Sequence, residues 1–239
     1  MMKTKVVIQG CGKLGSLVAT EVEKRKDMQV VAGIDASESQ QFNFPVFQSL
    51  DEDAVGCDVI IDGSSPEALS SFLGYAIKWE VPLVIGTTGH SEQQRKEIAK
   101  ASEQIPILMA SNFSIGATLL IKFIAATVRY YQELGVNVEV EITEWHHTRK
   151  KDAPSGTAKT IKERIQSVRG TAEDIPIESI REGDIIGIHE VKMTAGKEIL
   201  RFSHEVVDRI AFAQGAVNAA KFIVGKAPGL YSMNDLFNI

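Results

Sequence analysis

Short apolar runs of strand length alternate with helix-forming segments through the first 112 residues, and this alternation restricts the chain to few folds. After the first run, apolar residues recur at helical spacing between residues 14 and 22, and later segments repeat the pattern. Strands separated by helices in this way form right-handed crossovers and a parallel sheet. The sequence therefore predicts an α/β fold with a Rossmann-like doubly wound sheet. The predicted strands cover residues 5–9, 29–34, 58–61, 82–85 and 106–109.

A second pattern begins after about residue 137. In residues 137–144 (NVEVEITE), apolar and polar side chains alternate with a period of two, which is typical of a strand with one buried face. Residues 184–194 and 198–204 add two strand-like runs on either side of a turn at Ala195-Gly196. We therefore expect a second, smaller α+β domain whose sheet is partly antiparallel.

Composition narrows the range of partners. The 239 residues are 44% hydrophobic and 24% charged, which is typical of a globular protein with one large domain or two modest ones. The net charge of −5 argues against nucleic acid or an anionic membrane as the main partner, because both favour a basic surface. Two cysteines are too few for a disulfide framework and fit a reducing compartment. Because neither a signal segment nor an apolar run of about 18 residues occurs, we expect a cytoplasmic protein that does not enter a membrane.

A glycine motif lies at the first turn, in the context that dinucleotide binding requires. It follows the first predicted strand and opens the first predicted helix, so backbone N–H groups can approach a pyrophosphate at the positive end of the helix. The alternative is a glycine-rich turn that binds no ligand. The motif is Gly10-Cys11-Gly12-Lys13-Leu14-Gly15, and the candidate cofactor-binding residues are Gly10, Gly12, Lys13, Leu14 and Gly15.

Asp35 ends the second predicted strand, 20 residues after Gly15. A carboxylate there can accept hydrogen bonds from the adenosine ribose hydroxyls, although the same residue could also be a solvated strand end. Its neighbour Ala36 is not cationic, which favours NADH over NADPH because a 2′-phosphate beside Asp35 would meet like charge. Lys13 weakens this preference, since it could reach such a phosphate. We expect NADH, NADPH or both as cofactor, with NADH preferred or dual use.

Two further loops follow predicted strands at the edge where doubly wound sheets bind ligands. Their small side chains leave room for a ribose or a nicotinamide. Residue types alone describe ordinary loops equally well. The loops are Gly86-Thr87-Thr88-Gly89 and Ala110-Ser111-Asn112-Phe113, and the candidate cofactor-binding residues in them are Gly86, Thr87, Thr88, Ala110, Ser111, Asn112 and Phe113.

The segment EITEWHHTRKKDAPSGTA, residues 141–158, concentrates charge and turn-forming residues. Metal binding by His146 and His147 is disfavoured, because neighbours on an extended chain point to opposite sides and the nearby cations repel a metal ion. A solvated basic loop and an anion site both remain open. Residues 153–158 look like a helix start, whose N–H groups bind a carboxylate. Cations, a helix N-terminus and a titratable histidine together suit a small dianionic acid with a proton donor beside it.

The same segment resembles the signature E-x-H-H-x-x-K-x-D-A-P-S-G-T-A of the dihydrodipicolinate reductase family, also called 4-hydroxy-tetrahydrodipicolinate reductases, of lysine and diaminopimelate biosynthesis. The resemblance extends over nearly the whole chain. It implies an oxidoreductase that transfers a hydride from NAD(P)H to an unsaturated cyclic dicarboxylate. The other similar stretches are Gly86-Thr87-Thr88-Gly89, Asn112-Phe113-Ser114-x-Gly116, Gly183-Asp184-Ile185-x-Gly187-x-His189 and Phe212-Ala213-x-Gly215-Ala216.

The resemblance also implies roles for individual residues. His146 would be the general acid/base, and Lys150 would be a proton donor. His147 would bind one substrate carboxylate, and the helix-start amides of Gly156 and Thr157 would bind the other. No metal is implied.

The family pattern further implies a domain arrangement. Residues 1–112 and 213–239 would form the dinucleotide-binding domain, because the C-terminal tail packs back onto it. Residues 113–212 would bind the substrate and form oligomers through their sheet. We expect a homotetramer, with a dimer as the alternative.

Some features depart from the family pattern, and the first is the glycine turn, which is G-x-G-x-x-G where many relatives have G-x-x-G-x-x-G. Trp145 replaces a usual alanine beside the expected catalytic histidine, where it could narrow the pocket or join a subunit contact, and Ile188 replaces a usual glutamate. Residues 169–181 form a shorter segment than in most relatives. His189, His204 and Arg201 are expected to have supporting roles. A non-enzymatic NAD-sensing regulator could share the first domain, but it would not need a proton donor beside a dicarboxylate pocket. Another dehydrogenase, such as one that acts on an amino-acid semialdehyde, would share the first domain and differ in the second.

Overall fold

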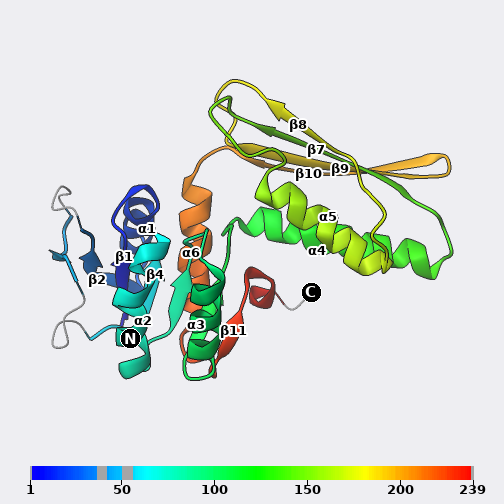
Figure 1. Ribbon diagram of the computed structural model, residues 1–239. Helices are drawn as coiled ribbons and strands as arrows, with labels where there is room; N and C mark the ends of the chain where they lie inside the picture. The colour runs from blue at the N-terminus through cyan, green and yellow to red at the C-terminus, as the bar shows by residue number, and fades with distance from the viewer. Residues whose placement is uncertain (1, 37–41, 50–55, 238–239) are drawn as a thin grey trace. The chain divides into compact units, whose positions relative to one another are not determined.

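The computed structural model describes residues 2–36, 42–49 and 56–237, and the chain divides into two compact units (Figure 1). Unit 1 comprises Met1–Phe113 and Ile210–Asn238, and unit 2 comprises Ser114–Arg209. The C-terminal segment therefore returns to the unit that contains the N-terminus. In the described part of the chain, no helix is both long enough and apolar enough to cross a membrane.

The sheet of unit 1 is parallel and runs in the order β11-β6-β5-β4-β1-β2-β3. The order changes direction between β1 and β4, and such a switch point is where open α/β sheets bind ligands. This architecture confirms the predicted doubly wound fold. The strands are β1 (Thr4–Gln9), β2 (Met28–Ile34), β3 (Val46–Phe47), β4 (Val59–Asp62), β5 (Leu83–Ile85), β6 (Pro106–Met109) and β11 (Gly229–Tyr231).

Helices bury both faces of this sheet. Consecutive residues of β5, Leu83, Val84 and Ile85, are all fully buried, as expected of a strand covered on both sides. Helices α2 and α3 pack on one face through a core that includes Phe72 and Ile98, while α1 and α6 pack against each other and against the strands. The helical elements of unit 1 are α1 (Lys13–Glu23), α2 (Leu69–Lys78), α3 (Glu92–Ser102), α6 (Ile210–Ile223) and the short η1 (Pro66–Ala68) and η2 (Met233–Leu236).

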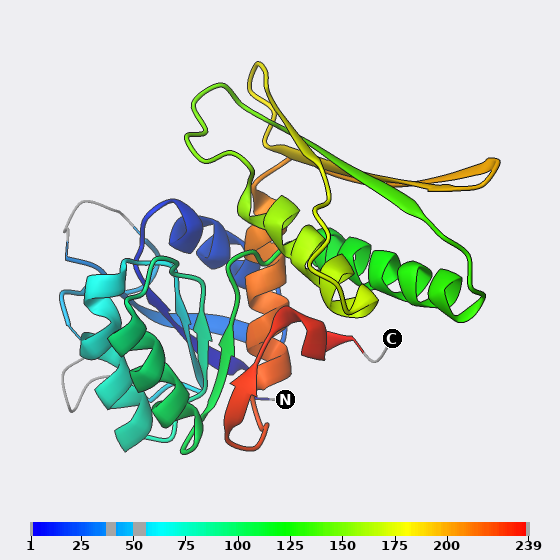
Figure 2. The ribbon, with the colours of Figure 1, turned by 45° about the vertical axis from the view of Figure 1, so that its right-hand side comes forward.

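Unit 2 has a mixed sheet in the order β10-β9-β7-β8, with two helices packed on one face (Figure 2). Strand β9 is antiparallel to both of its neighbours, whereas β7 and β8 run parallel. The core between sheet and helices includes Ile124, Ile142, Ile161 and Val191. The elements are α4 (Ile115–Glu133), β7 (Glu139–His146), α5 (Gly156–Arg169), β8 (Ile177–Arg181), β9 (Gly187–Ala195) and β10 (Glu198–Val206).

Three strands were not predicted from the sequence. Strand β8 lies at the end of the segment 169–181, and β11 begins at Gly229. Strand β3 has only two residues. Each strand is too short to show a clear period of its own, and β8 and β11 exist because they pair with strands far away in the sequence.

Candidate active site

The glycine motif forms the turn between β1 and α1 in unit 1. Gly10 has a φ of 84°, a left-handed conformation that glycine adopts without strain. A Cβ on Gly15 would lie 2.0 Å from the carbonyl oxygen of Gly10, so any side chain there would disrupt the turn. A Cβ on Gly12 would meet no atom within 4 Å, and no side chain caps the N-terminus of α1. The turn therefore fits the close approach of a pyrophosphate, with exposed Lys13 and half-buried Leu14 beside it.

Asp35 is tied to this turn. Its Oδ2 accepts a hydrogen bond of 2.8 Å from the backbone N–H of Cys11. The turn and the end of β2 pack closely, because a Cβ on Gly33 would lie 2.5 Å from the sulfur of Cys11. The carboxylate of Asp35 thus lies beside the turn, where a ribose of a dinucleotide would be recognised. Burial and the neighbouring Asp35 raise the pKa of the Cys11 thiol to about 11, so Cys11 is not a nucleophile at neutral pH.

The two further predicted loops meet at Phe113. A Cβ on Gly86 would lie 2.5 Å from the Phe113 ring, and Phe113 is only 3% exposed. Thr87 is also buried. The side chain of Phe113 therefore packs between the loops and is not available to a ligand. The predicted cofactor-binding positions of these loops that are exposed or half-buried are Gly86, Thr88, Ala110, Ser111 and Asn112.

Asp62, at the end of β4, was not predicted as a site residue. Its Oδ1 accepts hydrogen bonds from the backbone N–H of Ser64 at 3.1 Å and from the Ser64 hydroxyl at 2.5 Å. Burial raises the pKa of this carboxyl group. Asp62 is in register with Gln9 and Ile85, so it lies at the same sheet edge as the glycine turn and the Gly86 loop. Its position at a strand end was the only sequence signal.

His146 ends β7 in unit 2 and is 7% exposed. Its Nδ1 forms a hydrogen bond with Oε2 of Glu144, two residues earlier on the same face of the strand. A carboxylate only accepts hydrogen bonds, so the Nδ1 of His146 is the donor and carries a proton. Nε2 lies near Gly187, where a Cβ would be 3.1 Å away. Because glycine occupies that position, Nε2 is left uncrowded and can exchange a proton with a bound molecule.

Glu144 is fully buried, and its second oxygen has two donors. Oε1 accepts from Nη2 of Arg181 at 2.8 Å and from the backbone N–H of Ser155 at 3.3 Å. The same Nη2 donates to the carbonyl oxygen of Asp152 at 2.6 Å. Arg181 lies opposite His146 in the parallel register of β7 and β8. Sequence reasoning missed Arg181 because β8 itself was not predicted.

His189 of β9 joins this group from the other side. It lies opposite Glu144 in register, and its ring centroid is 5.3 Å from that of His146. A hydrogen bond of 3.1 Å connects its Nε2 to the Oγ of Ser155. Ser155 is the N-cap of α5 and accepts the N–H of Ala158 at 3.2 Å. The sheet thereby fixes the start of α5 beside His146.

The same pairing recurs on the next strand. His204 of β10 forms a hydrogen bond of 3.1 Å between its Nε2 and the Oγ of Ser114, which is the N-cap of α4. Its ring lies 6.4 Å from that of His189, centroid to centroid. Both helices of unit 2 therefore begin at a serine held by a histidine of the sheet. His189 and His204 thus each hold the serine at the start of a helix, which is consistent with the supporting roles expected of them. Arg201, also on β10, has a different partner: its Nε lies 3.6 Å from Oε1 of Glu190.

The pKa values of these groups follow from burial and from their partners. Burial lowers the pKa of His146, and the hydrogen bond to Glu144 opposes that effect. Burial would raise the pKa of Glu144, but hydrogen bonds led by that of Arg181 outweigh it and lower the pKa. Burial lowers the pKa of His189 to about 4. At neutral pH the group therefore contains an ionised Glu144 and a neutral His189.

The basic residues of the loop after β7 differ in their exposure to solvent and in their partners. Lys150 is largely sheltered, its Nζ lies 2.8 Å from Oδ1 of Asp152, and its charge further lowers the pKa of His146. Arg149 is 72% exposed and pairs with Asp184 at the surface. His147 is half-buried, and its Nδ1 has no hydrogen-bond partner among the residues that the structure describes. Lys150 and His147 are thus less exposed to solvent than Arg149, and their charges or hydrogen bonds to a ligand would be less screened by water.

Gly156 and Thr157 are the first residues of α5. The first helical hydrogen bond is donated by Lys159 to the carbonyl oxygen of Ser155 at 3.1 Å, so the amides of Gly156 and Thr157 precede the helical ladder. A Cβ on Gly156 would meet no atom within 4 Å. This helix start is therefore open and carries the positive end of the helix dipole.

Glu144, His146 and His189 offer ligand atoms that lie within 4.8 Å of one another, which raises the question of a metal ion. The geometry disfavours one. Both oxygens of Glu144 and the Nδ1 of His146 are already engaged in hydrogen bonds. The guanidinium of Arg181, with its Nη2 2.8 Å from Oε1 of Glu144, already pairs with this carboxylate and would repel a metal ion.

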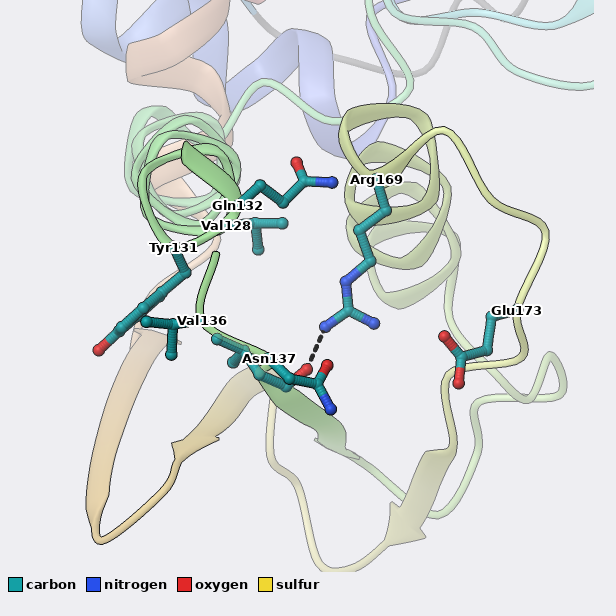
Figure 3. Close-up of a pocket in the computed structure, with 8 residues that line it drawn as sticks. Val128, Tyr131, Gln132, Val136, Asn137, Arg169 and Glu173 are labelled. Atoms are coloured by element: carbon teal, nitrogen blue, oxygen red, sulfur yellow. Dashed lines mark hydrogen bonds between the residues drawn. The ribbon is translucent and has the colours of Figure 1, made fainter. Parts of the chain in front are cut away.

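A separate cavity of about 170 Å³ lies at the other ends of the unit 2 helices (Figure 3). In it, the Arg169 guanidinium donates a hydrogen bond to the carbonyl oxygen of Val138. None of the predicted site residues lines this cavity. The lining residues are Val128, Tyr131, Gln132, Val136, Asn137, Val138, Arg169 and Glu173.

Comparison with known proteins matches both units. Family models described as "Dihydrodipicolinate reductase, N-terminus" and "Dihydrodipicolinate reductase, C-terminus" match residues 4–113 and 116–237. The chain is 36% identical to the 4-hydroxy-tetrahydrodipicolinate reductase of Caldanaerobacter subterraneus subsp. tengcongensis, with 98% of each chain covered. It is 38% identical to the enzyme of the same name from Methanoculleus marisnigri, over 98% of this chain and 99% of the other.

The chain is also similar to solved structures. The dipicolinate-bound dihydrodipicolinate reductase from Paenisporosarcina sp. TG-14 is 25% identical, with a TM-score of 0.86 over 99% of this chain and 100% of the other. A structure described as "C. glutamicum DAP dehydrogenase in complex with DAP" is 13% identical, with a TM-score of 0.63 over 100% of this chain and 97% of the other, and shares the fold alone.

Proposed function

The chain belongs to the dihydrodipicolinate reductase family, and we propose that it transfers a hydride from NADH or NADPH to 4-hydroxy-tetrahydrodipicolinate or dihydrodipicolinate. The product is tetrahydrodipicolinate, in lysine and diaminopimelate biosynthesis. One observation carries the proposal: a buried histidine with a fixed Nδ1 proton, His146, lies in the same unit as the sheltered cation Lys150 and the open start of α5. This combination suits a small dianion that must receive a proton.

The substrate's two carboxylates have distinct ligands in this proposal. The amides of Gly156 and Thr157 bind one carboxylate, because the N-terminus of α5 carries partial positive charge. His147 binds the other through a ring nitrogen, and its buried Nδ1 has no partner among the described side chains. The relative with dipicolinate bound supports a flat cyclic dicarboxylate as the ligand class.

The reaction adds one hydride and one proton across a double bond, and from the 4-hydroxy form a water molecule also leaves. The reduced nicotinamide, when bound, supplies the hydride. Negative charge then develops on the ring at a position remote from the carbon that gains the hydride. His146 discharges it by donating a proton from Nε2, and Lys150 is the second proton donor beside it.

The cofactor would be held by unit 1. The amides at the glycine turn bind the pyrophosphate, and Asp35 accepts hydrogen bonds from the adenosine ribose. We propose that NADH is preferred or that both cofactors are used, because Asp35 repels a 2′-phosphate while Lys13 attracts it. The nicotinamide and its ribose would contact the predicted positions of the other two loops that are exposed or half-buried, which are Gly86, Thr88, Ala110, Ser111 and Asn112.

The proposal also assigns roles to the two domains, an oligomeric state and a cellular location. Residues 1–112 and 213–239 act as the dinucleotide-binding domain, and residues 113–212 bind the substrate and form a homotetramer through their sheet. The apolar residues on the outer face of that sheet, opposite α4 and α5, support such a contact: Trp145, Ile180 and Ile188 are cross-strand neighbours there. We also propose a cytoplasmic location for the enzyme.

The test is consumption of NADH and of NADPH with enzymatically generated substrate, followed by the absorbance of the reduced nicotinamide. We expect oxidation that depends on both the protein and the substrate. His146→Gln serves as the control for contaminating reductases. It removes only the proposed general acid, so activity from a contaminant would remain at the wild-type level. Absence of substrate-dependent oxidation with either cofactor would refute the proposed function.

A further inference from the structure

Resting on the proposed function, we propose that Glu144 is a positioning residue that fixes the proton of His146 on Nδ1 and so reserves Nε2 for proton transfer to the substrate. The carboxylate belongs to the same strand as His146 and lies on the same face. It does not need to touch the substrate in order to act. Its effect is exerted through the imidazole.

The geometry of Glu144 leaves it one orientation. The side chain is fully buried, so water cannot replace a protein partner. Oε1 is held by Arg181 from β8 and by the Ser155 amide at the start of α5. Oε2 therefore faces the Nδ1 of His146 and accepts its proton. Two different elements thus hold the carboxylate, which in turn holds the imidazole.

Fixing the imidazole has a chemical consequence. A neutral imidazole carries its proton on only one nitrogen, so a proton on Nδ1 leaves a lone pair on Nε2. When the ring takes up a second proton, that proton binds at Nε2, beside Gly187, whose position would bring a Cβ to 3.1 Å from this nitrogen if it carried a side chain. The proton that His146 donates is therefore the one at Nε2, and the Nδ1 proton stays with Glu144.

Other charged and titratable groups face His146 from the neighbouring elements, but none of them can set this orientation. Lys150 and Asp152 in the following loop pair with each other. Arg181 is a donor that binds Glu144, and His189 from β9 directs its Nε2 to Ser155. His204 of β10 lies beyond His189 and binds Ser114. Among the described residues, only Glu144 forms a hydrogen bond with the His146 ring.

Glu144→Gln tests the inference because it should move the proton of neutral His146 from Nδ1 to Nε2. The donors from Arg181 and Ser155 still face the position of Oε1, so the amide oxygen of glutamine must occupy it. The NH₂ group then faces the Nδ1 of His146 and donates to it. Nδ1 becomes an acceptor, and the neutral ring must carry its proton on Nε2. The variant therefore reverses the tautomer while keeping nearly the same shape.

The experiment measures the tautomer and the kinetics of the same proteins. Nitrogen NMR of labelled histidines, with the His146 signal assigned by its loss in His146→Gln, should show an Nδ1–H tautomer in the wild type and an Nε2–H tautomer in Glu144→Gln. Turnover of the variant should fall about 10²-fold or more, with unchanged NADH binding. Loss of the carboxylate also destabilises the imidazolium, so the alkaline limb of the turnover profile should move about one pH unit or more downward.

Two outcomes would overturn the inference. An Nε2–H tautomer in the wild type refutes it directly, and this measurement does not require the variant to fold. A reversed tautomer in Glu144→Gln with undiminished turnover refutes the positioning role. Glu144→Asp, which keeps a carboxylate, should retain the Nδ1–H tautomer and lose less turnover than Glu144→Gln.

Glu163→Gln is the matched control, because it removes one exposed carboxylate from α5 of the same unit and should change neither tautomer nor turnover. Failure of the proposed function has a different signature. In that case the wild type would not reduce the substrate at all, while the NMR measurement would still report the tautomer of His146.

Discussion

Trp145 and His146 are consecutive residues of β7, and their side chains lie on opposite faces of the unit 2 sheet. His146 faces Glu144 and His189 on the face covered by the helices. Trp145 lies on the outer face, in register with Ile180 of β8 and Ile188 of β9. Because neighbours on a strand alternate, the indole cannot narrow a pocket at His146. The substitution of tryptophan at this position therefore concerns the outer face.

The outer face gives the first prediction. Trp145→Glu should lower the fraction of tetramer, because it places a charge in the apolar cluster with Ile180 and Ile188. Light scattering after size exclusion measures the change. Trp79→Glu is the control, since Trp79 is 52% exposed at the end of α2 and the charge should leave assembly unchanged. An unaltered mass for Trp145→Glu would exclude this face as a subunit contact.

His146→Gln should lower turnover about 10²-fold or more, because the variant lacks the proposed general acid. Binding of NADH, measured by fluorescence, should stay near the wild-type value, since His146 belongs to unit 2 and the proposed cofactor residues belong to unit 1. His147→Gln is the comparison: it should raise the Michaelis constant for the substrate more than it lowers turnover. Undiminished turnover in His146→Gln would remove this residue from the mechanism.

Gly156→Ala should weaken ligand binding at the start of α5 without lowering the stability of the fold. The added Cβ meets no atom within 4 Å, so the thermal midpoint should not fall. If a carboxylate binds at this helix start, the methyl group should weaken binding of pyridine-2,6-dicarboxylate about tenfold or more, as expected for a lost charged hydrogen bond. Calorimetric titration provides the affinity.

Gly74→Ala on α2 is the matched control for this helix start, because its Cβ also meets no atom within 4 Å and it lies in unit 1. The dicarboxylate should compete with the substrate in the wild type. Equal affinity in Gly156→Ala and Gly74→Ala would argue that the ligand does not use the start of α5.

Cofactor preference tests the balance between Asp35 and Lys13. The wild type should have a lower Michaelis constant for NADH than for NADPH, because the Asp35 carboxylate beside the glycine turn repels a 2′-phosphate. Lys13→Met should raise the constant for NADPH and leave that for NADH nearly unchanged. Lys26→Met, at another exposed lysine of unit 1, should change neither. The reverse order of constants in the wild type would show that a cation dominates.

Folding stability should fall as the pH is lowered from 6.5, the ordinary pKa of histidine, to about 4, the pKa of buried His189. In this window the unfolded chain takes up a proton at His189 and the folded protein does not, so acid favours unfolding. The full effect is about 3 kcal/mol. Urea denaturation at several pH values measures it.

His189→Gln should reduce this dependence on pH without abolishing it, because burial also lowers the pKa values of His146 and His204. The comparison concerns the slope, since the variant also loses the hydrogen bond to Ser155. A variant that loses as much stability between the two pH values as the wild type would show that His189 is not the responsible group.

The sequence by itself determined the elements that depend on local properties. The alternation of strands and helices, the glycine turn before α1 and the one-sided strand β7 were all predicted, because side-chain period and the conformational freedom of glycine act within a few residues. A helix start within residues 153–158 was also predicted, and in the structure α5 begins there, at Gly156, with Ser155 as its N-cap.

The tertiary structure alone decided what surrounds His146. Arg181 is 37 residues from Glu144 and His189 is 34 residues from Ser155, and both contacts exist only because β8 and β9 pair with β7 in one register. The same register placed Trp145 on the outer face, and the order of strands in unit 1 brought Asp62 to the edge with the glycine turn. Strand pairing is a long-range interaction whose register follows from the burial of whole faces, and a single short strand such as β8 carries too little pattern to specify its partner.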